Sequence, residues 1–168
     1  MKAGLIRPAV EPKAPKAPAI ADWKAQPWSA GGSAAIILKD ANDTETLKQV
    51  DRLLKDLASD PKNGIAAILD RRAVAELGGA PNVAFWVDLK PGFAIGSAPA
   101  GALTRDVPVR GTHGYAPTHQ EMRASFFITG PGIPKGKALG EIDIRSVGPT
   151  LAKGLGISLP AADLKPLF

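Results

Sequence analysis

The chain has 168 residues and a mass of 17.4 kDa, which suits one domain or part of a larger one. Hydrophobic residues make up 45% and charged residues 22%, close to the averages of globular proteins, so a largely disordered or fibrous chain is excluded. No apolar run approaches the roughly 20 residues that cross a bilayer, and no secretion signal is visible. The absence of cysteine rules out disulfides and thiolate metal sites and leaves the compartment open.

The chain carries a formal net charge of +5, which is compatible with an anionic partner. Its basic residues are spread along the sequence and interleaved with acidic residues, not gathered in one run. We therefore interpret the charge as a contribution to solubility, and we do not expect a nucleic acid as a partner.

The first 32 residues are predicted to form a proline-rich extended arm. Proline recurs at positions 8, 12, 15, 18 and 27, and each proline removes a backbone donor and fixes φ. A regular helix or a central strand is therefore not expected in this arm. Burial of the Trp23 and Trp28 rings would pin the arm to a surface, and stacking of these rings on a ligand is the alternative.

Regular patterning begins at Ser33 and predicts a small α/β subdomain over residues 33–97. The short apolar run at 34–38 predicts a buried strand. A helix is expected to begin after Asp43, since apolar residues then recur at three- and four-residue steps on one face. It should end before Pro61, because proline disfavours helical geometry in the residue that precedes it.

The rest of this subdomain alternates strands with one short helix. Residues 65–69 predict a second strand, and Asp70 can cap a short helix that ends near Leu77, before two glycines. Residues 83–89 predict a third strand, and residues 93–95 predict a fourth after a Pro-Gly turn. The order of these elements indicates a compact unit with its own small core.

Residues 98–168 are predicted to form a loop, a strand and a helix. The loop covers 98–122, and the apolar run 124–129 predicts the strand. Ser146 is a suitable N-cap for the helix, which Gly156 should close. Three apolar residues would line one face of this helix, namely Val147, Leu151 and Leu155.

Two histidines are the chain's only imidazoles, and they lie close together in this loop. His113 stands between Gly111 and Gly114, whose small size lets the backbone turn sharply and lets an imidazole reach into a crowded site. A loop histidine is more often a surface or hydrogen-bonded residue, so this setting alone does not identify a ligand. His119 has no such setting, and we expect it to be a solvated loop residue.

Other familiar site patterns are absent or incomplete. The glycine- and lysine-rich segment 130–137 lacks the spacing of a phosphate-binding loop, and its prolines remove amide donors that a phosphate needs. The sequence has no Gly-x-Ser-x-Gly nucleophile turn and no His-Glu-x-x-His zinc motif. Asp143 could be a metal ligand, but an exposed acid near a helix start is the expected role.

In three consecutive segments, particular residue types stand at fixed spacing. They read Gly-Thr-His-Gly-Tyr-Ala-Pro at 111–117, Glu-Met-Arg-Ala-Ser-Phe-Phe at 121–127 and Gly-Pro-Gly-Ile at 130–133. Together they resemble the C-terminal signature of the type I phosphodiesterase/nucleotide pyrophosphatase family, which belongs to the alkaline phosphatase superfamily. Residues 143–159 resemble the family's last helix, and residues 31–36 and 90–93 resemble bacterial members of the family. The resemblance therefore extends over most of the chain.

The resemblance implies an α/β fold in which this chain is the alkaline-phosphatase-like C-terminal portion and carries the small α/β subdomain. It also implies that residues 98–168 are a metal-site loop, a strand and a helix that return to the core sheet of the complete protein. In that family, carboxylates and histidines hold two zinc-like ions, and a Thr or Ser nucleophile attacks phosphorus. One ligand histidine lies in the Gly-x-His-Gly segment and maps onto His113. Neutral imidazole is a good zinc ligand, and a two-metal site activates a nucleophile and stabilises charge on the phosphoryl group. A phosphoester is the implied substrate of the complete protein.

The family's nucleophile and an Asp-His-Gly segment lie upstream, and this chain contains no Asp-His pair. We therefore expect the catalytic N-terminal half to be missing, with no catalytic residue here, His113 as at most one zinc ligand, and no activity from this chain alone. The alternative is a non-enzymatic binding or assembly module derived from that family, which would act as an oligomer or with a complementing N-terminal half. The resemblance points to an exported bacterial protein, although the sequence itself leaves the localisation unknown.

Overall fold

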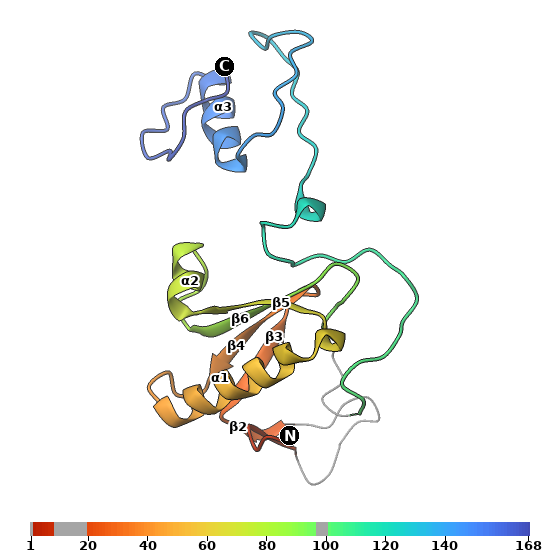
Figure 1. Ribbon diagram of the computed structural model, residues 1–168. Helices are drawn as coiled ribbons and strands as arrows, with labels where there is room; N and C mark the ends of the chain where they lie inside the picture. The colour runs from red at the N-terminus through yellow and green to blue at the C-terminus, as the bar shows by residue number, and fades with distance from the viewer. Residues whose placement is uncertain (1, 9–19, 97–100) are drawn as a thin grey trace. The chain divides into compact units, whose positions relative to one another are not determined.

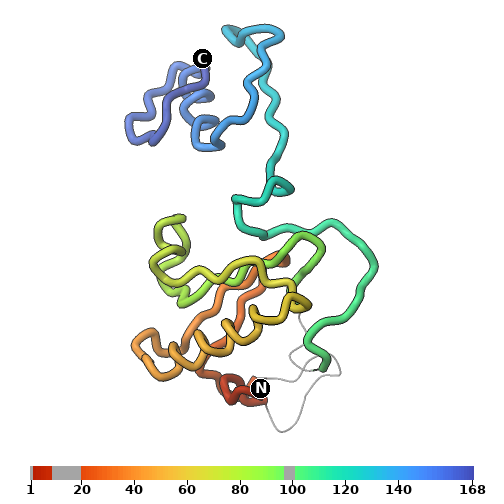
Figure 2. Tube along the Cα trace, viewed as in Figure 1, coloured from red at the N-terminus to blue at the C-terminus, as the bar shows by residue number. Residues whose placement is uncertain are grey.

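The structure is a computed structural model that describes residues 2–8, 20–96 and 101–168. It divides into two compact units, Met1–Arg123 and Ala124–Phe168, whose course is traced in Figure 2. The expectations for prolines 12, 15 and 18 and for the loop at residues 98–100 lie outside the described residues. The predicted division of the chain at residues 32 and 97 stays a prediction.

A four-stranded antiparallel sheet forms the centre of the first unit (Figure 1). β4 and β5 are each antiparallel to β6, so they run parallel to one another with β6 between them. The mixed α/β class is therefore confirmed in its coarse form. In spatial order, the strands are β3 (Ala25–Ser29), β4 (Ser33–Leu38), β6 (Val83–Leu89) and β5 (Ile65–Asp70).

Helix α1 (Thr44–Ser59) connects β4 to β5 and covers one face of the sheet. The Asp43 carboxylate accepts a hydrogen bond from the Thr46 amide at 2.9 Å, which satisfies a free donor of the first turn. The helix ends at Ser59, as expected from the proline at 61, which opens the short 3₁₀ helix η1 (Pro61–Asn63). The core on this face consists of Leu5, Ala25, Leu38, Val50, Leu54, Ala84, Phe85, Val87 and Leu89.

Helix α2 (Arg71–Glu76) follows β5 and packs through Val74 against a second cluster. The Asp70 carboxylate caps this helix by accepting from the Ala73 amide at 2.9 Å. Because side chains alternate along β6, Trp86 joins the α2 cluster while its neighbours Phe85 and Val87 pack with α1. The predicted strands at 34–38, 65–69 and 83–89 and the capped helix after Asp70 are confirmed.

The described part of the predicted arm is extended, and it forms strands. β1 (Ile6–Pro8) pairs with β2 (Ile20–Trp23), and β3 pairs with β4 at one edge of the sheet. Pro27 is tolerated in β3 because an edge strand does not need every amide as a donor. Trp23 is half-buried, but the expected burial of Trp28 is wrong, since 70% of this residue is exposed.

The second unit holds η3 (Ile144–Ser146) and α3 (Val147–Gly154), so the predicted helix is confirmed. Thr150 is its most buried residue, with 2% exposed. The Thr150 hydroxyl donates to the Ser146 carbonyl at 2.6 Å and accepts from the Leu167 amide at 2.9 Å, which ties the tail to the helix. The predicted apolar face is not buried, since 48% of Leu151 and 73% of Leu155 are exposed.

Two predicted strands are wrong. Residues 93–95 make a turn bond from the Phe93 amide to the Lys90 carbonyl at 3.1 Å and one bond from the Ile95 amide to the Gly31 carbonyl at 2.7 Å. Single bonds of this kind do not form a ladder. Residues 124–129 are irregular, and no strand pairs with them among the described residues. Apolar composition predicted both strands, but a strand exists only where a second strand supplies its hydrogen bonds.

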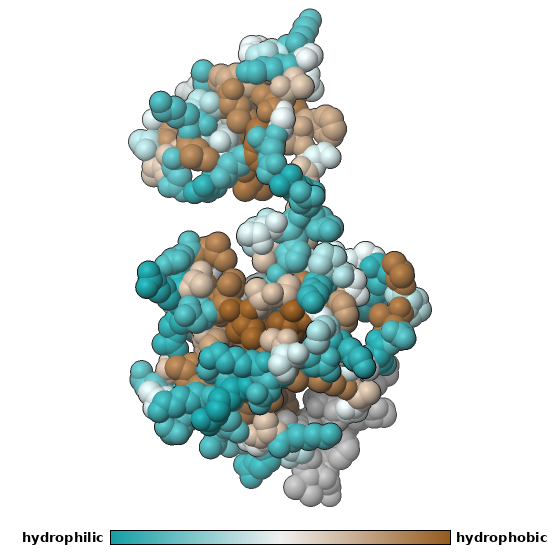
Figure 3. Space-filling model, in the orientation of Figure 1, coloured by the Kyte–Doolittle hydropathy of each residue, from teal (hydrophilic) through white to brown (hydrophobic). Residues whose placement is uncertain are grey.

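Apolar side chains are exposed on the second unit, and Figure 3 shows such residues at the molecular surface. A shallow cavity of the same unit is lined mainly by apolar residues, including Phe126, Ile133 and Leu139. The described helices include none that is both long enough and apolar enough to cross a membrane. The large apolar residues with high exposure in this unit are Phe127, Ile144, Leu151, Leu155, Ile157 and Leu159.

Candidate functional site

The candidate site is the segment 111–119, which lies against the end of the sheet where Ser33 and Asp88 face one another. Ser33 begins β4, Asp88 lies near the end of β6, and the two residues are direct partners in the strand register. Ser33 is fully buried and Asp88 is 3% exposed. Buried polar groups need hydrogen-bond partners, and the segment 111–119 supplies them for both residues.

Both oxygens of the Asp88 carboxylate contact this segment. Oδ1 accepts a hydrogen bond from the Ala116 amide at 2.8 Å, and Oδ2 lies 2.5 Å from Nε2 of His119. The side chains are shielded from solvent, with 4% of Asp88 and 15% of His119 exposed. A histidine–carboxylate pair thus holds the segment at its C-terminal end.

Two further contacts hold the segment beside His113. The Gly32 amide donates to the His113 carbonyl at 2.7 Å. The Ser33 hydroxyl donates to the Gly114 carbonyl. Because both acceptors are backbone atoms, the main chain at His113 is fixed independently of its imidazole.

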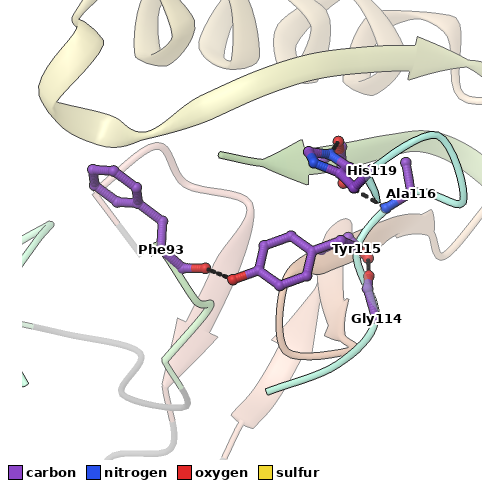
Figure 4. Close-up of polar contacts among 7 residues, drawn as sticks. Phe93, Gly114, Tyr115, Ala116 and His119 are labelled. Atoms are coloured by element: carbon purple, nitrogen blue, oxygen red, sulfur yellow. Dashed lines mark hydrogen bonds and ion pairs between the residues drawn. The ribbon is translucent and has the colours of Figure 1, made fainter. Parts of the chain in front are cut away.

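Glycine and one tyrosine complete the packing of the segment. Gly114 has φ +80°, and a Cβ at this position would lie 1.7 Å from the Ala30 carbonyl oxygen. The Tyr115 ring covers Gly32 so closely that a Cβ there would lie 2.4 Å from the ring. The Tyr115 hydroxyl donates to the Phe93 carbonyl at 2.7 Å, as Figure 4 shows. Tyr115 therefore has a packing role in the segment.

His113, the predicted metal ligand, is exposed, although its carbonyl is bonded to the sheet. No group of three or more His, Cys, Asp or Glu side chains that could hold a metal ion occurs in the part of the chain that the structure describes. His113 thus offers one imidazole, and its assignment as a zinc ligand stays a prediction.

The expectation that His119 is a solvated loop residue is wrong, since it contacts Asp88 from a half-buried position. It lies just before the 3₁₀ helix η2 (Gln120–Met122), and its amide bonds to the Ala116 carbonyl at 3.1 Å. The contact joins positions 31 residues apart, so no local spacing could have identified it. The isolated acid in the apolar strand β6 was the one available signal, because a buried carboxylate requires a partner.

Ser33, His119 and Asp88 are the residue types of a hydrolytic triad, but their contacts differ from one. The Ser33 hydroxyl donates to the Gly114 carbonyl, and no hydrogen bond joins it to His119 among the described residues. A nucleophilic serine needs a base that accepts its proton. The three residues therefore form a structural anchor and not a nucleophile with its base.

Asp143 has the exposed helix-start role that the sequence predicted. Its carboxylate caps η3 and pairs with Arg145, whose Nη2 lies 2.7 Å from Oδ2. The hydrogen bonds from the Arg145 side chain and amide hold the Asp143 pKa at about 2, below its ordinary value of 3.8. Both oxygens are thus engaged within the second unit.

The fold and the site define a small α/β unit that fixes a histidine-bearing loop through a buried carboxylate. No protein-family model, no curated protein and no solved structure matches the chain. The resemblance to the phosphodiesterase family therefore rests on the segments quoted above.

Substitution of Gly114 tests the tight contact of this segment with Ala30. We expect Gly114→Ala to lower the free energy of unfolding by about 1–3 kcal/mol, because alanine is strained at positive φ and its Cβ meets the Ala30 carbonyl. The measurement is urea unfolding. Gly111→Ala is the matched control, since no atom lies within 4 Å of a Cβ at that position. Equal losses in both variants would contradict the role assigned to Gly114.

Titration of Asp143 tests its pairing with Arg145. Because the folded pKa is depressed, the pair stabilises the fold above the ordinary pKa, and this contribution is lost as the pH falls towards about 2. We expect the carboxyl ¹³C signal of Asp143 to titrate near 2 and to move towards 3.8 in Arg145→Ala. Lys153→Ala is the control and should leave the midpoint unchanged. A wild-type midpoint near 3.8 would show that the pair does not form in solution.

Proposed function

We propose that the chain is the C-terminal part of a metal-dependent phosphodiesterase or nucleotide pyrophosphatase, in which His113 donates its imidazole to one ion of a two-zinc site. One observation carries the proposal. The main chain at His113 and Gly114 is bonded to Gly32 and Ser33, while His113 remains exposed. This segment also belongs to the stretch 111–132, where the resemblance to the family is most specific.

A fixed main chain with a free imidazole suits a metal ligand. A ligand whose backbone is already ordered loses less conformational entropy when it binds, and its ring starts from a defined position. The Gly32 and Ser33 contacts use only carbonyl oxygens, so both nitrogens of His113 are spared by them. A surface histidine on a loose loop would lack this support.

The described residues supply one ligand of such a site. His113 is a nitrogen donor of the kind zinc prefers, and the remaining ligands and the nucleophile are expected upstream. When bound, the zinc ions would activate the nucleophile and stabilise negative charge on the phosphoryl group. The contribution of this chain is to hold one imidazole and to pack the loop that carries it.

The alkaline-phosphatase-like architecture is the finer part of the proposal. Residues 124–129 are apolar and extended in sequence character, yet no strand pairs with them among the described residues. A catalytic domain with an open sheet edge would supply the missing partner. The exposed apolar residues of α3, Leu151 among them, would be covered by the same domain.

We expect the purified chain alone to show no zinc-dependent hydrolysis of an aryl phosphodiester such as bis(p-nitrophenyl) phosphate. The physical reason is that one imidazole cannot bind two metal ions, and the nucleophile of the proposed site is expected upstream. The assay compares p-nitrophenolate release with and without added zinc. Robust hydrolysis that disappears in His113→Ala would contradict this expectation.

The encoding DNA tests the proposal itself. An in-frame Asp-His-Gly segment upstream would support it, and its absence from the complete reading frame would overturn it. In the protein encoded by that longer frame, we expect His113→Ala to lower kcat/KM by more than about a hundredfold, since even residues that only orient a ligand cost up to this factor. Thr118→Ala, an exposed residue of the same loop, is the control and should retain activity.

A second candidate function is an assembly module, which the exposed apolar side chains of the second unit favour. If a second copy covers them, light scattering after size exclusion should give a mass above 17.4 kDa that rises with concentration. Leu155→Lys should then shift the chain towards monomer. Val109→Lys is the control, since Val109 is an exposed apolar residue of the first unit. A monomer at all concentrations would exclude this candidate.

A further inference from the structure

Asp88 places a carboxylate beside core residues of β6. It is 3% exposed, and its neighbours Val87 and Leu89 are buried members of the core. Removal of an ionised carboxylate from water costs several kcal/mol unless hydrogen bonds and a counter-charge compensate. Its carboxylate oxygens contact the Ala116 amide and His119, and both of these groups come from the segment 111–119.

The same contacts attach the C-terminal end of the segment, beyond the packed ring of Tyr115. Ala116 is its one buried residue, and Tyr115 and His119 are half-buried. Their rings lie near one another, with centroids 5.5 Å apart. Apolar burial in the segment is therefore modest, and the hydrogen bonds to Asp88 carry much of its docking.

Two sets of attachments hold the chain from His113 onwards. The nearer set bonds the His113 and Gly114 carbonyls to Gly32 and Ser33, and the Tyr115 hydroxyl to the Phe93 carbonyl. The farther set consists of the contacts of Ala116 and His119 with Asp88. If the farther set is released, the chain after Tyr115 loses its hydrogen bonds to the sheet, and the range of positions open to the His113 ring widens.

We propose that Asp88 and His119 are positioning residues that form a latch and hold the His113 ring in place. The latch acts through the loop and touches neither the ring nor a metal ion. This inference deepens the proposed function, because the position of the ring matters for catalysis only if the ring binds zinc. The order of the loop can be measured without any metal. An experiment can therefore contradict the latch without contradicting the zinc-ligand role of His113, and the reverse.

The backbone order parameter at His113 is the first readout. In the wild-type chain we expect a value near 0.85, typical of a rigid backbone, and in His119→Ala a value below about 0.6. His119→Gln is the rescue variant, because its amide can donate to Asp88 in place of the imidazole Nε2–H. We expect it to restore most of the order, which a general loss of stability would not do.

Amide exchange gives the second readout. We expect exchange at Ala116 to accelerate by about ten- to a hundredfold in His119→Ala, since a hydrogen-bonded charged group contributes about 1.5–3 kcal/mol. Exchange at Val87, inside β6, should change less, because the sheet keeps its own ladder. Asp88→Asn keeps an acceptor for the Ala116 amide. In this variant, amide exchange should therefore accelerate more at His119 than at Ala116.

A matched control separates the latch from the loss of any acid. Asp56→Ala removes an exposed carboxylate of α1 and should leave both readouts unchanged. The latch is overturned if His119→Ala leaves His113 ordered and Ala116 protected, or if Val87 loses protection as much as Ala116. Should the latch hold while no Asp-His-Gly is encoded upstream, the latch stands and the proposed function fails.

Discussion

The burial of the Asp88 carboxylate is the constraint on which the site depends. Its position in β6 places a charge beside core residues, and its partners come from a loop about thirty residues further along the chain. A buried carboxylate without partners costs several kcal/mol, so the sheet is stabilised when the loop docks. The loop in turn gains an attachment that its small apolar area could not provide.

The hydrogen bonds between Asp88 and the loop explain why the loop has a defined position although most of its residues are exposed. Polar contacts and close glycine packing determine its path, while His113 is left at the surface. In the second unit, the Thr150 hydroxyl binds the tail, and apolar residues such as Leu155 are exposed.

Elements governed by local interactions were predictable from the sequence. The caps at Asp43 and Asp70 act on amides three residues away, so the starts of α1 and α2 could be placed before any fold was known. The proline at 61 similarly marks the end of α1. The strands at 65–69 and 83–89 could be placed because each is a short apolar run between turn residues.

The sequence by itself determined the α/β class, the helix boundaries and the glycine-flanked setting of His113, because these depend on neighbours within a few residues. Tertiary structure alone decided that His119 pairs with Asp88 and that residues 124–129 form no strand. Both outcomes depend on which residue, far away in the sequence, supplies the hydrogen-bond partner. Hydrogen bonds between remote residues form only after the chain has folded, so composition and spacing cannot specify them.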